Sequence, residues 1–293
     1  MVLSGIEQGA DAVIARELYR RVDAALARLG LLVRVFGRVK SPDSVKWKLK
    51  CKAESYAAEE KKMQDYFGLR VAVYFPDDVP VVRGLLERLF VLRGTSIDEP
   101  DQETFGPTRY NLVFALPTEL CSPVIERFER VDQAFEVQLR TILSEGWHEV
   151  EHDLRYKCQS EWDGRPDLYR AMNGVVATLE NCDWSMLRIF EEQAYRHYKA
   201  SNWVPMLRAK MRVRVQDRPL ESALGGLLTA DEALAKRVYR LDRNVFMRAW
   251  MKSGVAMPIT WSNLVFLANH LVLRDSSIAA LVPSVLGDVF ATA

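Results

Sequence analysis

The sequence predicts an α+β fold in which helices flank a mixed β-sheet, followed by a helical C-terminal region. Alternating or β-branched runs are interspersed with amphipathic helical stretches over the first two thirds of the chain, and no strand pattern of comparable quality follows. We therefore expect a sheet-containing domain over residues 1–200 and a mostly helical accessory region over residues 201–293. No internal repeat or low-complexity segment is evident.

The first expected elements are a helix and a strand. Apolar residues recur at near-helical spacing from Ala10 to Leu29, and Gly30 is expected to end this helix. Leu31–Phe36 is a short apolar run that predicts a strand. Residues 45–50 are ambiguous. Apolar residues and lysines alternate there, as is typical of a strand, yet the preceding Ser41–Pro42 is typical of a helix start.

The elements that follow alternate between strands and helices. Leu69–Phe75 has the clearest strand pattern, with Leu69, Val71, Val73 and Phe75 facing one way. The other expected elements are helix 81–92, strands 110–116 and 134–140, helices 141–156 and 168–196, and helical stretches 230–251 and 264–273. In the segment ITWSNLVFLANHLVL, which begins at Ile259, Trp261, Leu264, Leu267 and Leu271 fall near one face, which must be buried.

Composition excludes several classes of protein. The 293 residues include 40 basic and 39 acidic ones, and this net charge of +1 argues against a general nucleic-acid coat. The four cysteines form no C-x-x-C pair, so neither a zinc knuckle nor a disulfide framework is indicated. The N-terminus lacks a signal-peptide pattern, and no apolar run is long enough to span a membrane. We expect a cytoplasmic protein.

Positive charge is concentrated locally in the stretch Gly37–Lys52. Against one acid, Asp43, this stretch carries six cations: Arg38, Lys40, Lys46, Lys48, Lys50 and Lys52. Such local clustering in a nearly neutral chain predicts a site for an anion.

A row of polar side chains on a strand is the second indication of a site. In the segment FEVQLRT, Phe135, Val137 and Leu139 point to the core, so Glu136, Gln138 and Arg140 share the opposite face. This row predicts either a polar site or a solvated outer face of the sheet.

Two further segments have polar side chains that suit a site. Asp65 precedes a strand, where it fits either a site built at the strand end or a turn. The helical segment TILSEGWHEVEHDLRYK carries glutamates and histidines, but they lack the H-E-x-x-H spacing of a zinc site. On spacing alone, this segment favours a buried helix with satisfied polar partners.

Together, these segments resemble the RelA/SpoT alarmone synthetases. RVKSPDSVKWK is similar to the family signature R-x-K-x-x-x-S-x-x-x-K, and DYFGLR to D-x-x-G-x-R. EVQLRT and GWHEVEHDLRYK are similar to E-x-Q-x-R-T and W-x-x-x-E-H-x-x-x-Y-K. The four motifs occur in order over about half of the chain. The resemblance implies the nucleotidyltransferase-like fold of these synthetases and leaves the last ninety or so residues unexplained.

The resemblance implies transfer of the β,γ-pyrophosphate of ATP to the 3′-hydroxyl of a guanosine nucleotide. Arg38, Lys40 and Lys48 would hold the ATP phosphates, and Ser44 would support their loop. Fixed cations suit this role because they offset the charge of the donor phosphates without reorganising. The family also implies a helix beginning near Ser44, and we adopt this helix over the alternating strand pattern.

The remaining roles also come from the resemblance. Asp65 and Glu136 match the family's Mg²⁺ ligands, and Glu136 is a candidate general base for the attacking hydroxyl. Arg70, Gln138 and Arg140 would support the phosphates and the acceptor. Glu151 and His152 would stabilise the site from the following helix.

The strand expected to bind the acceptor departs from the family pattern G-Y-x-x-x-H, whose Tyr stacks on guanine. Alignment on Gly106 places Pro107 at the Tyr and Asn111 at the His. Alignment on Tyr110 keeps an aromatic residue but places Phe114 at the His. Stacking on an aromatic ring is worth about 1–3 kcal/mol, so this departure predicts an altered choice of acceptor. Tyr110 and Asn111 remain candidate acceptor-binding residues.

The hydrolase half of the long RelA/SpoT enzymes is not expected. Its metal site needs histidines ahead of the synthetase, and the first histidine here is His148. The chain is similar to a small alarmone synthetase, or to the toxic relatives that pyrophosphorylate the 3′ end of tRNA.

A second cationic run bears on the tRNA alternative. It comprises Arg196, Lys199, Arg208, Lys210, Arg212, Arg214 and Arg218, opposed only by Asp217 and interleaved with Tyr195, Tyr198 and Trp203. A large RNA acceptor needs such a patch outside the active site, but a solvated helix face or an oligomer interface has the same composition.

The partners expected are therefore ATP as donor and GDP, GTP or tRNA as acceptor. The helical region would control access to the site or bind an antitoxin, another regulatory protein or a second copy of the chain. An alternative from another class is a non-catalytic nucleotide-binding module that has lost its acceptor pocket.

Overall fold

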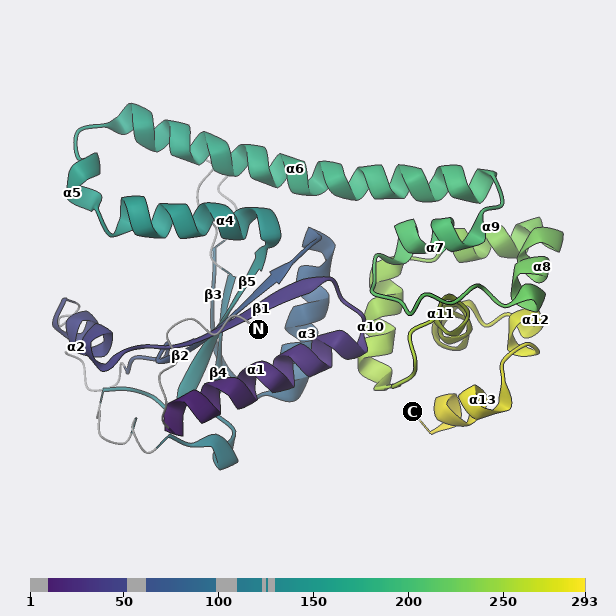
Figure 1. The fold of residues 1–293 in the computed structure, drawn as a ribbon, viewed down its shortest axis with the longest axis horizontal. Coiled ribbons are helices and arrows are strands. Elements are labelled where there is room, and N and C mark those ends of the chain that lie inside the picture. The colour runs from purple at the N-terminus through teal and green to yellow at the C-terminus, as the bar shows by residue number, and fades with distance from the viewer. Residues whose placement is uncertain (1–9, 52–61, 99–109, 123–124, 126–129, 293) are drawn as a thin grey trace. The chain divides into compact units, whose positions relative to one another are not determined.

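The computed structural model describes residues 10–51, 62–98, 110–122, 125 and 130–292 (Figure 1). The chain forms two compact units. Unit 1 contains residues 1–24, 33–79 and 86–181, and unit 2 contains residues 25–32, 80–85 and 182–293. Unit 2 thus includes two short segments from the first third of the chain. The expected division into domains 1–200 and 201–293 stays a prediction.

Unit 1 is built on a five-stranded mixed sheet with the strand order β1-β2-β5-β4-β3. Its strands are β1 (Val33–Val39), β2 (Phe67–Val73), β3 (Leu92–Ile97), β4 (Tyr110–Ala115) and β5 (Ala134–Thr141). The central pair, β2 and β5, is parallel, and the other neighbours are antiparallel. This arrangement confirms the predicted α+β class with a mixed sheet.

One face of the sheet is apolar and packs against a helix. Phe114 and Phe135 are fully buried on neighbouring strands, and their rings stack with centroids 5.6 Å apart. Phe90, directly after helix α3 (Val79–Leu89), packs edge-on against Phe135 at 4.9 Å. The segment at the end of α3 therefore packs on the apolar face, and Leu86 in this segment is completely buried.

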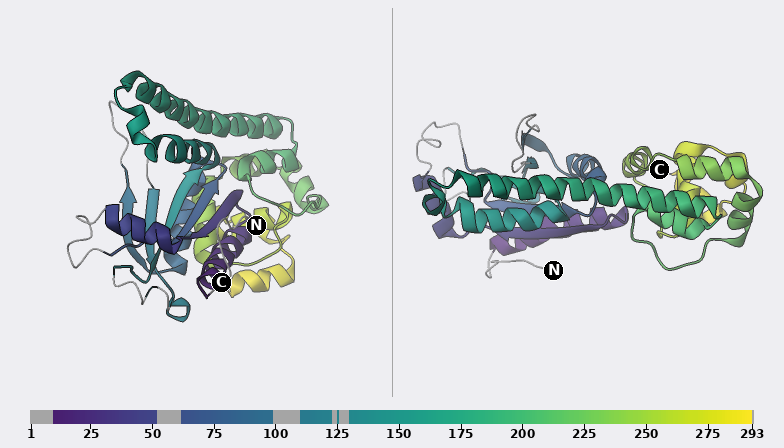
Figure 2. Two further views of the ribbon diagram at one scale, coloured as in Figure 1. Left: turned by 60° about the vertical axis from the view of Figure 1, so that its left-hand side comes forward. Right: turned by 90° about the horizontal axis from the view of Figure 1, so that it is seen from above.

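The opposite face of the sheet is polar, and helix α4 (Ile142–Glu151) lies over part of it. Thr141 ends β5 and caps α4, because its hydroxyl accepts the Ser144 amide while the Ser144 hydroxyl accepts the Thr141 amide. The strand therefore runs directly into the helix. A π-helical turn, η5 (His152–Tyr156), follows α4, and then come α5 (Gln159–Trp162) and α6 (Pro166–Lys199). Figure 2 shows α4 and the long α6 from two further sides.

The ambiguous stretch after β1 is a helix, α2 (Pro42–Cys51), as the family resemblance implied. Ser41 accepts the Ser44 amide at its side-chain oxygen, and proline occupies the first helical position. These local start signals override the period-two alternation of residues 45–50.

Several boundaries differ from those predicted. The predicted helix 81–92 ends earlier, at Leu89, because Phe90 is extended and leads into β3, a strand that the sequence did not indicate. The helix predicted over 141–156 is α-helical only to Glu151. The stretch 230–251 is two helices, α9 (Glu232–Arg240) and α10 (Arg243–Ser253), because Leu241 leaves the helical conformation and Asp242 caps α10.

Unit 2 is helical, and no strand is assigned to its described residues. Besides α9 and α10, its helices are α7 (Trp203–Met211), α8 (Ser222–Ala230), α11 (Trp261–Ala268), the π turn η6 (Asn269–Leu273), α12 (Ser276–Ala279) and α13 (Ser284–Ala291). Phe246, Trp250, Leu264 and Phe266 are completely buried in its core. The predicted burial of Trp261, Leu264 and Leu267 is confirmed, whereas Leu271 is only partly buried.

Gly30 ends helix α1 (Ala10–Arg28) with a φ of +63° and has a packing role in unit 2. Its carbonyl accepts the Arg214 amide at 2.7 Å, and a Cβ at this position would lie 2.9 Å from the Arg214 carbonyl oxygen. Glycine is therefore required both for the left-handed conformation and for the close approach. No described helix has the length and apolar character needed to cross a bilayer.

Candidate active site

The motif residues meet on the polar face of the sheet because of its strand register. One row across the sheet joins Arg38, Gly68 and Glu136 on β1, β2 and β5. The next row joins Phe36, Arg70, Gln138 and Asn111 on β1, β2, β5 and β4. Gly68 and Glu136, which are 68 residues apart in the chain, thus lie side by side on neighbouring strands.

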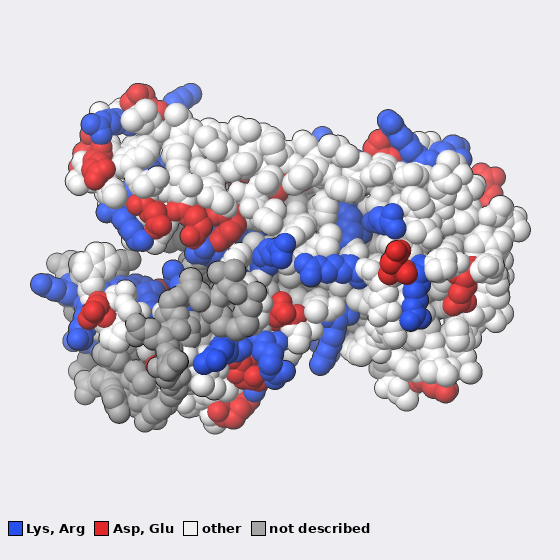
Figure 3. Space-filling model, in the orientation of Figure 1, with Lys and Arg blue, Asp and Glu red and all other residues white. Residues whose placement is uncertain are grey.

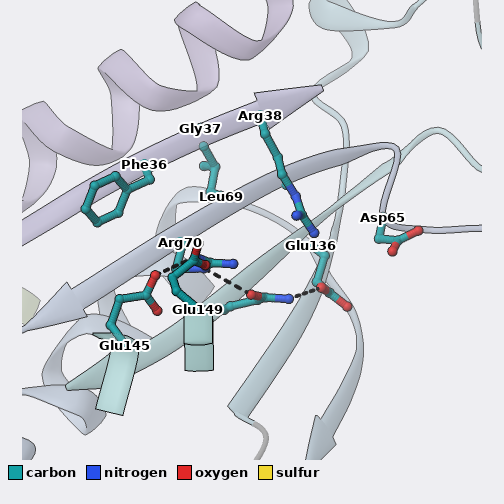
Figure 4. Close-up of a pocket in the computed structure, with 11 residues that line it drawn as sticks. Phe36, Gly37, Arg38, Asp65, Leu69, Arg70, Glu136, Glu145 and Glu149 are labelled. Carbon is teal, nitrogen blue, oxygen red and sulfur yellow. Dashed lines mark hydrogen bonds and ion pairs between the residues drawn. The ribbon is translucent and has the colours of Figure 1, made fainter. Parts of the chain in front are cut away.

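Gly68 leaves space for the Arg38 side chain beside it. A Cβ on Gly68 would lie 3.3 Å from Arg38 Nε and 3.4 Å from its Cγ. A larger residue at position 68 would displace the guanidinium, so this packing explains the glycine of the D-x-x-G-x-R motif. Figure 4 shows Arg38 extending from β1 towards Glu136.

Asp65 lies just before β2 and binds two lysines of the cationic stretch. Lys40 Nζ lies 2.8 Å from Asp65 Oδ2 and 3.2 Å from the Asp65 carbonyl oxygen. Lys48 Nζ lies 2.6 Å from the same Oδ2 atom. The backbone is tied at this point as well, because the Lys40 amide donates to the Tyr66 carbonyl at 2.9 Å.

The two lysines keep the Asp65 carboxylate ionised. Burial alone would raise the pKa of Asp65, but the charges of Lys40 and Lys48 outweigh burial and lower this pKa below its usual value. Burial also lowers the pKa of Lys40, against the attraction of Asp65. The site therefore holds a carboxylate that is paired with two ammonium groups.

Two glutamates of α4 hold Arg70 and were not predicted as site residues. Arg70 Nη1 donates to Glu145 at 2.5 Å and to Glu149, one helical turn later. Glu145 is 8% exposed and also faces Arg140, whose Nε lies 3.7 Å from its second oxygen. The only signal in the sequence was the i, i+4 spacing of these glutamates, which places both on one side of the helix.

Gln138 links the arginine to the predicted base. Its amide nitrogen donates to Glu136 at 2.8 Å, and its carbonyl oxygen accepts a bond from Arg70 at 3.3 Å. The amide orientation fits both partners, since the first needs a donor and the second an acceptor. Gln138 therefore fixes the position of the Glu136 carboxylate relative to Arg70.

His148 lies beside these arginines and is neutral. Burial lowers its pKa to about 3, and the charges of Arg140 and Arg70 act in the same direction. It therefore adds no further positive charge to the site at neutral pH.

A cavity of about 360 Å³, the Glu136 cavity, collects most of these groups (Figure 4). Arg38, Asp65, Arg70, Glu136 and Gln138 all line it, together with Glu145 and Glu149. A second cavity of about 400 Å³, the Tyr156 cavity, shares Arg38, Arg70 and Gln138 with the first. Its lining adds Arg140, Glu151 and His152 among the predicted site residues. The two cavities are therefore adjoining.

The other predicted residues lie outside both linings. Lys40 and Lys48 reach the site through Asp65. Ser44 is exposed, and its hydroxyl lies 2.9 Å from that of Ser41 at the start of α2, in keeping with a role in supporting the loop. Glu151, by contrast, lines the Tyr156 cavity and accepts two bonds from Arg155, both of 3.2 Å.

The register of β4 distinguishes the two alignments of the acceptor strand. Asn111 lies opposite Gln138 on the polar face, whereas Phe114 is fully buried on the apolar face. Tyr110 lies on the same face of the sheet as Phe114, because the two residues are an even number of positions apart in the strand. The structure therefore favours the alignment that places Asn111 at the histidine position. Pro107, which this alignment places at the tyrosine position, lies outside the described residues.

The carboxylates present fit the Mg²⁺ that the family implies. Asp65 and Glu136 come from different strands and line the same cavity. The Asp65 Oδ1 atom is buried and has no hydrogen-bond partner in the described part of the chain, while Oδ2 is neutralised by cations. A hard divalent cation suits such an oxygen atom.

Comparisons with known proteins agree with the motif assignment. Residues 37–161 match the family model described as a region found in RelA / SpoT proteins. The chain is 34% identical over 128 residues to GTP pyrophosphokinase YjbM of Bacillus subtilis (strain 168), which covers 42% of this chain and 56% of that relative. The chain therefore matches little more than half the length of this curated relative.

Solved structures of small alarmone synthetases are similar over a larger part of the chain. The small alarmone synthetase 1 of Bacillus subtilis has 22% identity and a TM-score of 0.46, covering 60% of this chain and 92% of that one. A GTP pyrophosphokinase family protein of Streptococcus pneumoniae has 24% identity and a TM-score of 0.44, covering 61% and 88%. Because these TM-scores lie below 0.5, the assignment rests on the sequence matches. Over residues 37–161, this chain is therefore similar to the region found in RelA / SpoT proteins.

Proposed function

We propose that the chain is an ATP-dependent pyrophosphokinase that transfers the β,γ-pyrophosphate of ATP to the 3′-hydroxyl of a guanosine nucleotide, as a (p)ppGpp synthetase does. The observation that carries this proposal is the convergence of Arg38, Asp65, Arg70 and Glu136 on one cavity. Pyrophosphoryl transfer needs cations for the donor phosphates and a carboxylate near the acceptor hydroxyl, and this cavity combines them.

Each group has a chemical role in this proposal. Arg38, Lys40 and Lys48 bind the triphosphate, and the two lysines leave Asp65 as they do so. Asp65 and Glu136 would hold Mg²⁺, which when bound offsets negative charge on the transferred phosphates. Freed of lysine Nζ atoms, both oxygens of Asp65 are available for this purpose.

Glu136 is the candidate general base. It accepts the proton of the 3′-hydroxyl while the 3′-oxygen bonds to the β-phosphorus and the bond between this phosphorus and the α,β-bridging oxygen breaks. The products are AMP and the 3′-pyrophosphorylated nucleotide, and one proton is released. Gln138 and Arg70 hold Glu136 and the phosphates in place during the transfer.

The test is incubation of the protein with Mg²⁺, ATP labelled in its γ-phosphate, and GDP, GTP, AMP, ADP or unlabelled ATP as acceptor. The expected result is a labelled 3′-pyrophosphorylated guanosine nucleotide, lost on addition of EDTA. Absence of labelled product from every acceptor would rule out a free-nucleotide synthetase. Mg²⁺-dependent transfer to any acceptor would rule out the alternative of a non-catalytic binding module.

A second candidate function is pyrophosphorylation of the 3′ end of tRNA. It is favoured by the β4 register, because the alignment that brings Asn111 beside Gln138 leaves no aromatic residue at the guanine-stacking position. If this function is correct, purified tRNA incubated with the protein and labelled ATP acquires the label at its 3′ end, and free nucleotides do not. The helical region would then contribute RNA contacts, and otherwise it would control access to the site or bind a regulatory protein.

A further inference from the structure

The π turn η5 after α4 presents a pair of stacked rings. The His152 and Tyr156 rings lie 5.8 Å apart at an interplanar angle of 12°. The turn is held at its other end, because the His152 carbonyl accepts the Lys157 amide and the Leu154 carbonyl accepts Trp162 Nε1 at 2.8 Å. Single π turns inside helices occur frequently at functional sites.

This ring pair is exposed on a cavity wall and is not part of the core. Tyr156 is 50% exposed, and both rings line the Tyr156 cavity. This cavity shares Arg38, Arg70 and Gln138 with the Glu136 cavity. A nucleoside whose base lay on Tyr156 would therefore be next to the phosphate-binding arginines.

The other side of the turn is anchored, which keeps the rings in place. Arg155 is 6% exposed and lies between two aromatic rings, 5.6 Å from the Trp147 centroid and 5.2 Å from the Tyr169 centroid. It also donates twice to Glu151, which lines the Tyr156 cavity. A preorganised platform of this kind loses little conformational freedom on binding.

We propose that the His152–Tyr156 pair is the stacking platform for the base of the acceptor nucleotide, replacing the aromatic residue that the acceptor strand lacks. The role of this nucleotide as acceptor rests on the proposed function. Its binding at the ring pair is argued from the cavity alone. Asp98 and Glu151 also line this cavity, and their carboxylates suit a base edge rich in N–H donors. Guanine, with adjacent N1–H and N2–H₂ groups, presents such an edge.

The test compares Tyr156→Ala, which removes the ring, with Tyr156→Phe, which keeps it. Binding of GDP in the absence of ATP is measured by calorimetry, and the KM values for GDP and ATP are measured separately. Tyr156→Ala is expected to weaken GDP binding and raise the KM for GDP about 5- to 150-fold, with the KM for ATP changed less than about twofold. Tyr156→Phe is expected to resemble the wild type.

Trp184→Ala is the matched control, because Trp184 is a comparably exposed aromatic residue, at 54%, that is not part of the lining of either cavity. Unchanged GDP binding by Tyr156→Ala, or no GDP binding by the wild type, overturns the platform. Tyr156-dependent GDP binding without any pyrophosphate transfer leaves the platform standing and overturns the proposed function instead. Pyrophosphate transfer to an acceptor other than GDP, with no dependence on Tyr156, overturns the platform and leaves the proposed transferase activity standing.

Discussion

The Arg38 side chain lies against the bare backbone of Gly68, its register partner on β2. A Gly68→Ala substitution would place a methyl group 3.3 Å from Arg38 Nε and force the Arg38 side chain to shift by a few tenths of an ångström within the Glu136 cavity. We expect the KM for ATP to rise about tenfold, which corresponds to about 1.4 kcal/mol of lost binding. Steady-state kinetics at varied ATP concentration measure this effect.

Gly94→Ala is the control for this substitution. Gly94 is also a strand glycine, but a Cβ there would meet no atom within 4 Å. Its KM for ATP should therefore stay at the wild-type value. Equal KM values for the two variants would contradict a specific role for the contact between Gly68 and Arg38.

Glu145 and Glu149 should differ in their contributions to stability, although both bind Arg70. Glu145 is buried between Arg70 and Arg140, so Glu145→Gln removes the negative charge that lies between these two guanidinium groups. We expect a loss of about 2–4 kcal/mol in the free energy of unfolding, measured in urea. The Glu149 side chain is 56% exposed, so Glu149→Gln should cost at most about 1 kcal/mol. Similar losses for both variants would show that burial of Glu145 is not the cause.

Stability should fall below neutral pH because of His148. Its pKa is lowered from 6.5 to about 3 in the folded protein, so between these values the unfolded chain binds the proton and the folded chain does not. The free energy of unfolding should therefore decrease as the pH falls from 7 to 5.5, a range above the usual pKa values of carboxyl groups. His148→Gln should flatten this dependence. Parallel pH dependences of wild type and variant, from urea unfolding at each pH, would contradict the assignment.

The second cationic run is not a continuous exposed surface. Arg212 is 6% exposed and has a left-handed φ of 48° at the end of α7, whereas Arg214 and Arg218 are exposed. On the face drawn in Figure 3, Lys and Arg side chains form several separate groups. Arg212→Glu should therefore destabilise the protein by about 2–4 kcal/mol, while Arg214→Glu should cost less than about 1 kcal/mol, as thermal or urea unfolding measures.

This difference decides how the tRNA alternative is tested. The pair Arg214→Glu and Arg218→Glu changes exposed charge and should abolish tRNA labelling if tRNA crosses this run. The pair Lys236→Glu and Lys252→Glu makes the same change of charge at other exposed positions of unit 2. Equal labelling of tRNA by both double variants would show that the run is not the RNA site.

Much of the fold could be predicted from local patterns, and the exceptions have physical reasons. Residues 110–115 and 134–141 are strands close to where alternation placed them. Strand β3 was not predicted, since its residues Leu92–Ile97 are mostly exposed at the sheet edge and show no apolar alternation. The π turn at His152–Tyr156 was not predicted either, because apolar spacing does not distinguish it from an α-helix.

The sequence predicted those residues of the candidate site that belong to a motif, but not those whose role depends on contacts between distant segments. Arg38, Asp65, Arg70 and Glu136 were found, and the structure gathers them around one cavity. The roles of Glu145 and Glu149 depend on their contacts with Arg70, more than 70 residues earlier in the chain. Likewise, only the register between β4 and β5 showed that Asn111, and not Phe114, lies beside Gln138.

Glu136→Gln tests the central claim most directly, because it removes a ligand charge and the candidate base while keeping the side-chain shape. Transfer of label from ATP to a guanosine nucleotide is measured with wild type and variant under saturating Mg²⁺, with unfolding in urea as the check on the fold. The account predicts labelled 3′-pyrophosphorylated product from the wild type, about 1,000-fold slower transfer by the variant, and an unchanged unfolding midpoint. Transfer by Glu136→Gln at the wild-type rate would contradict it.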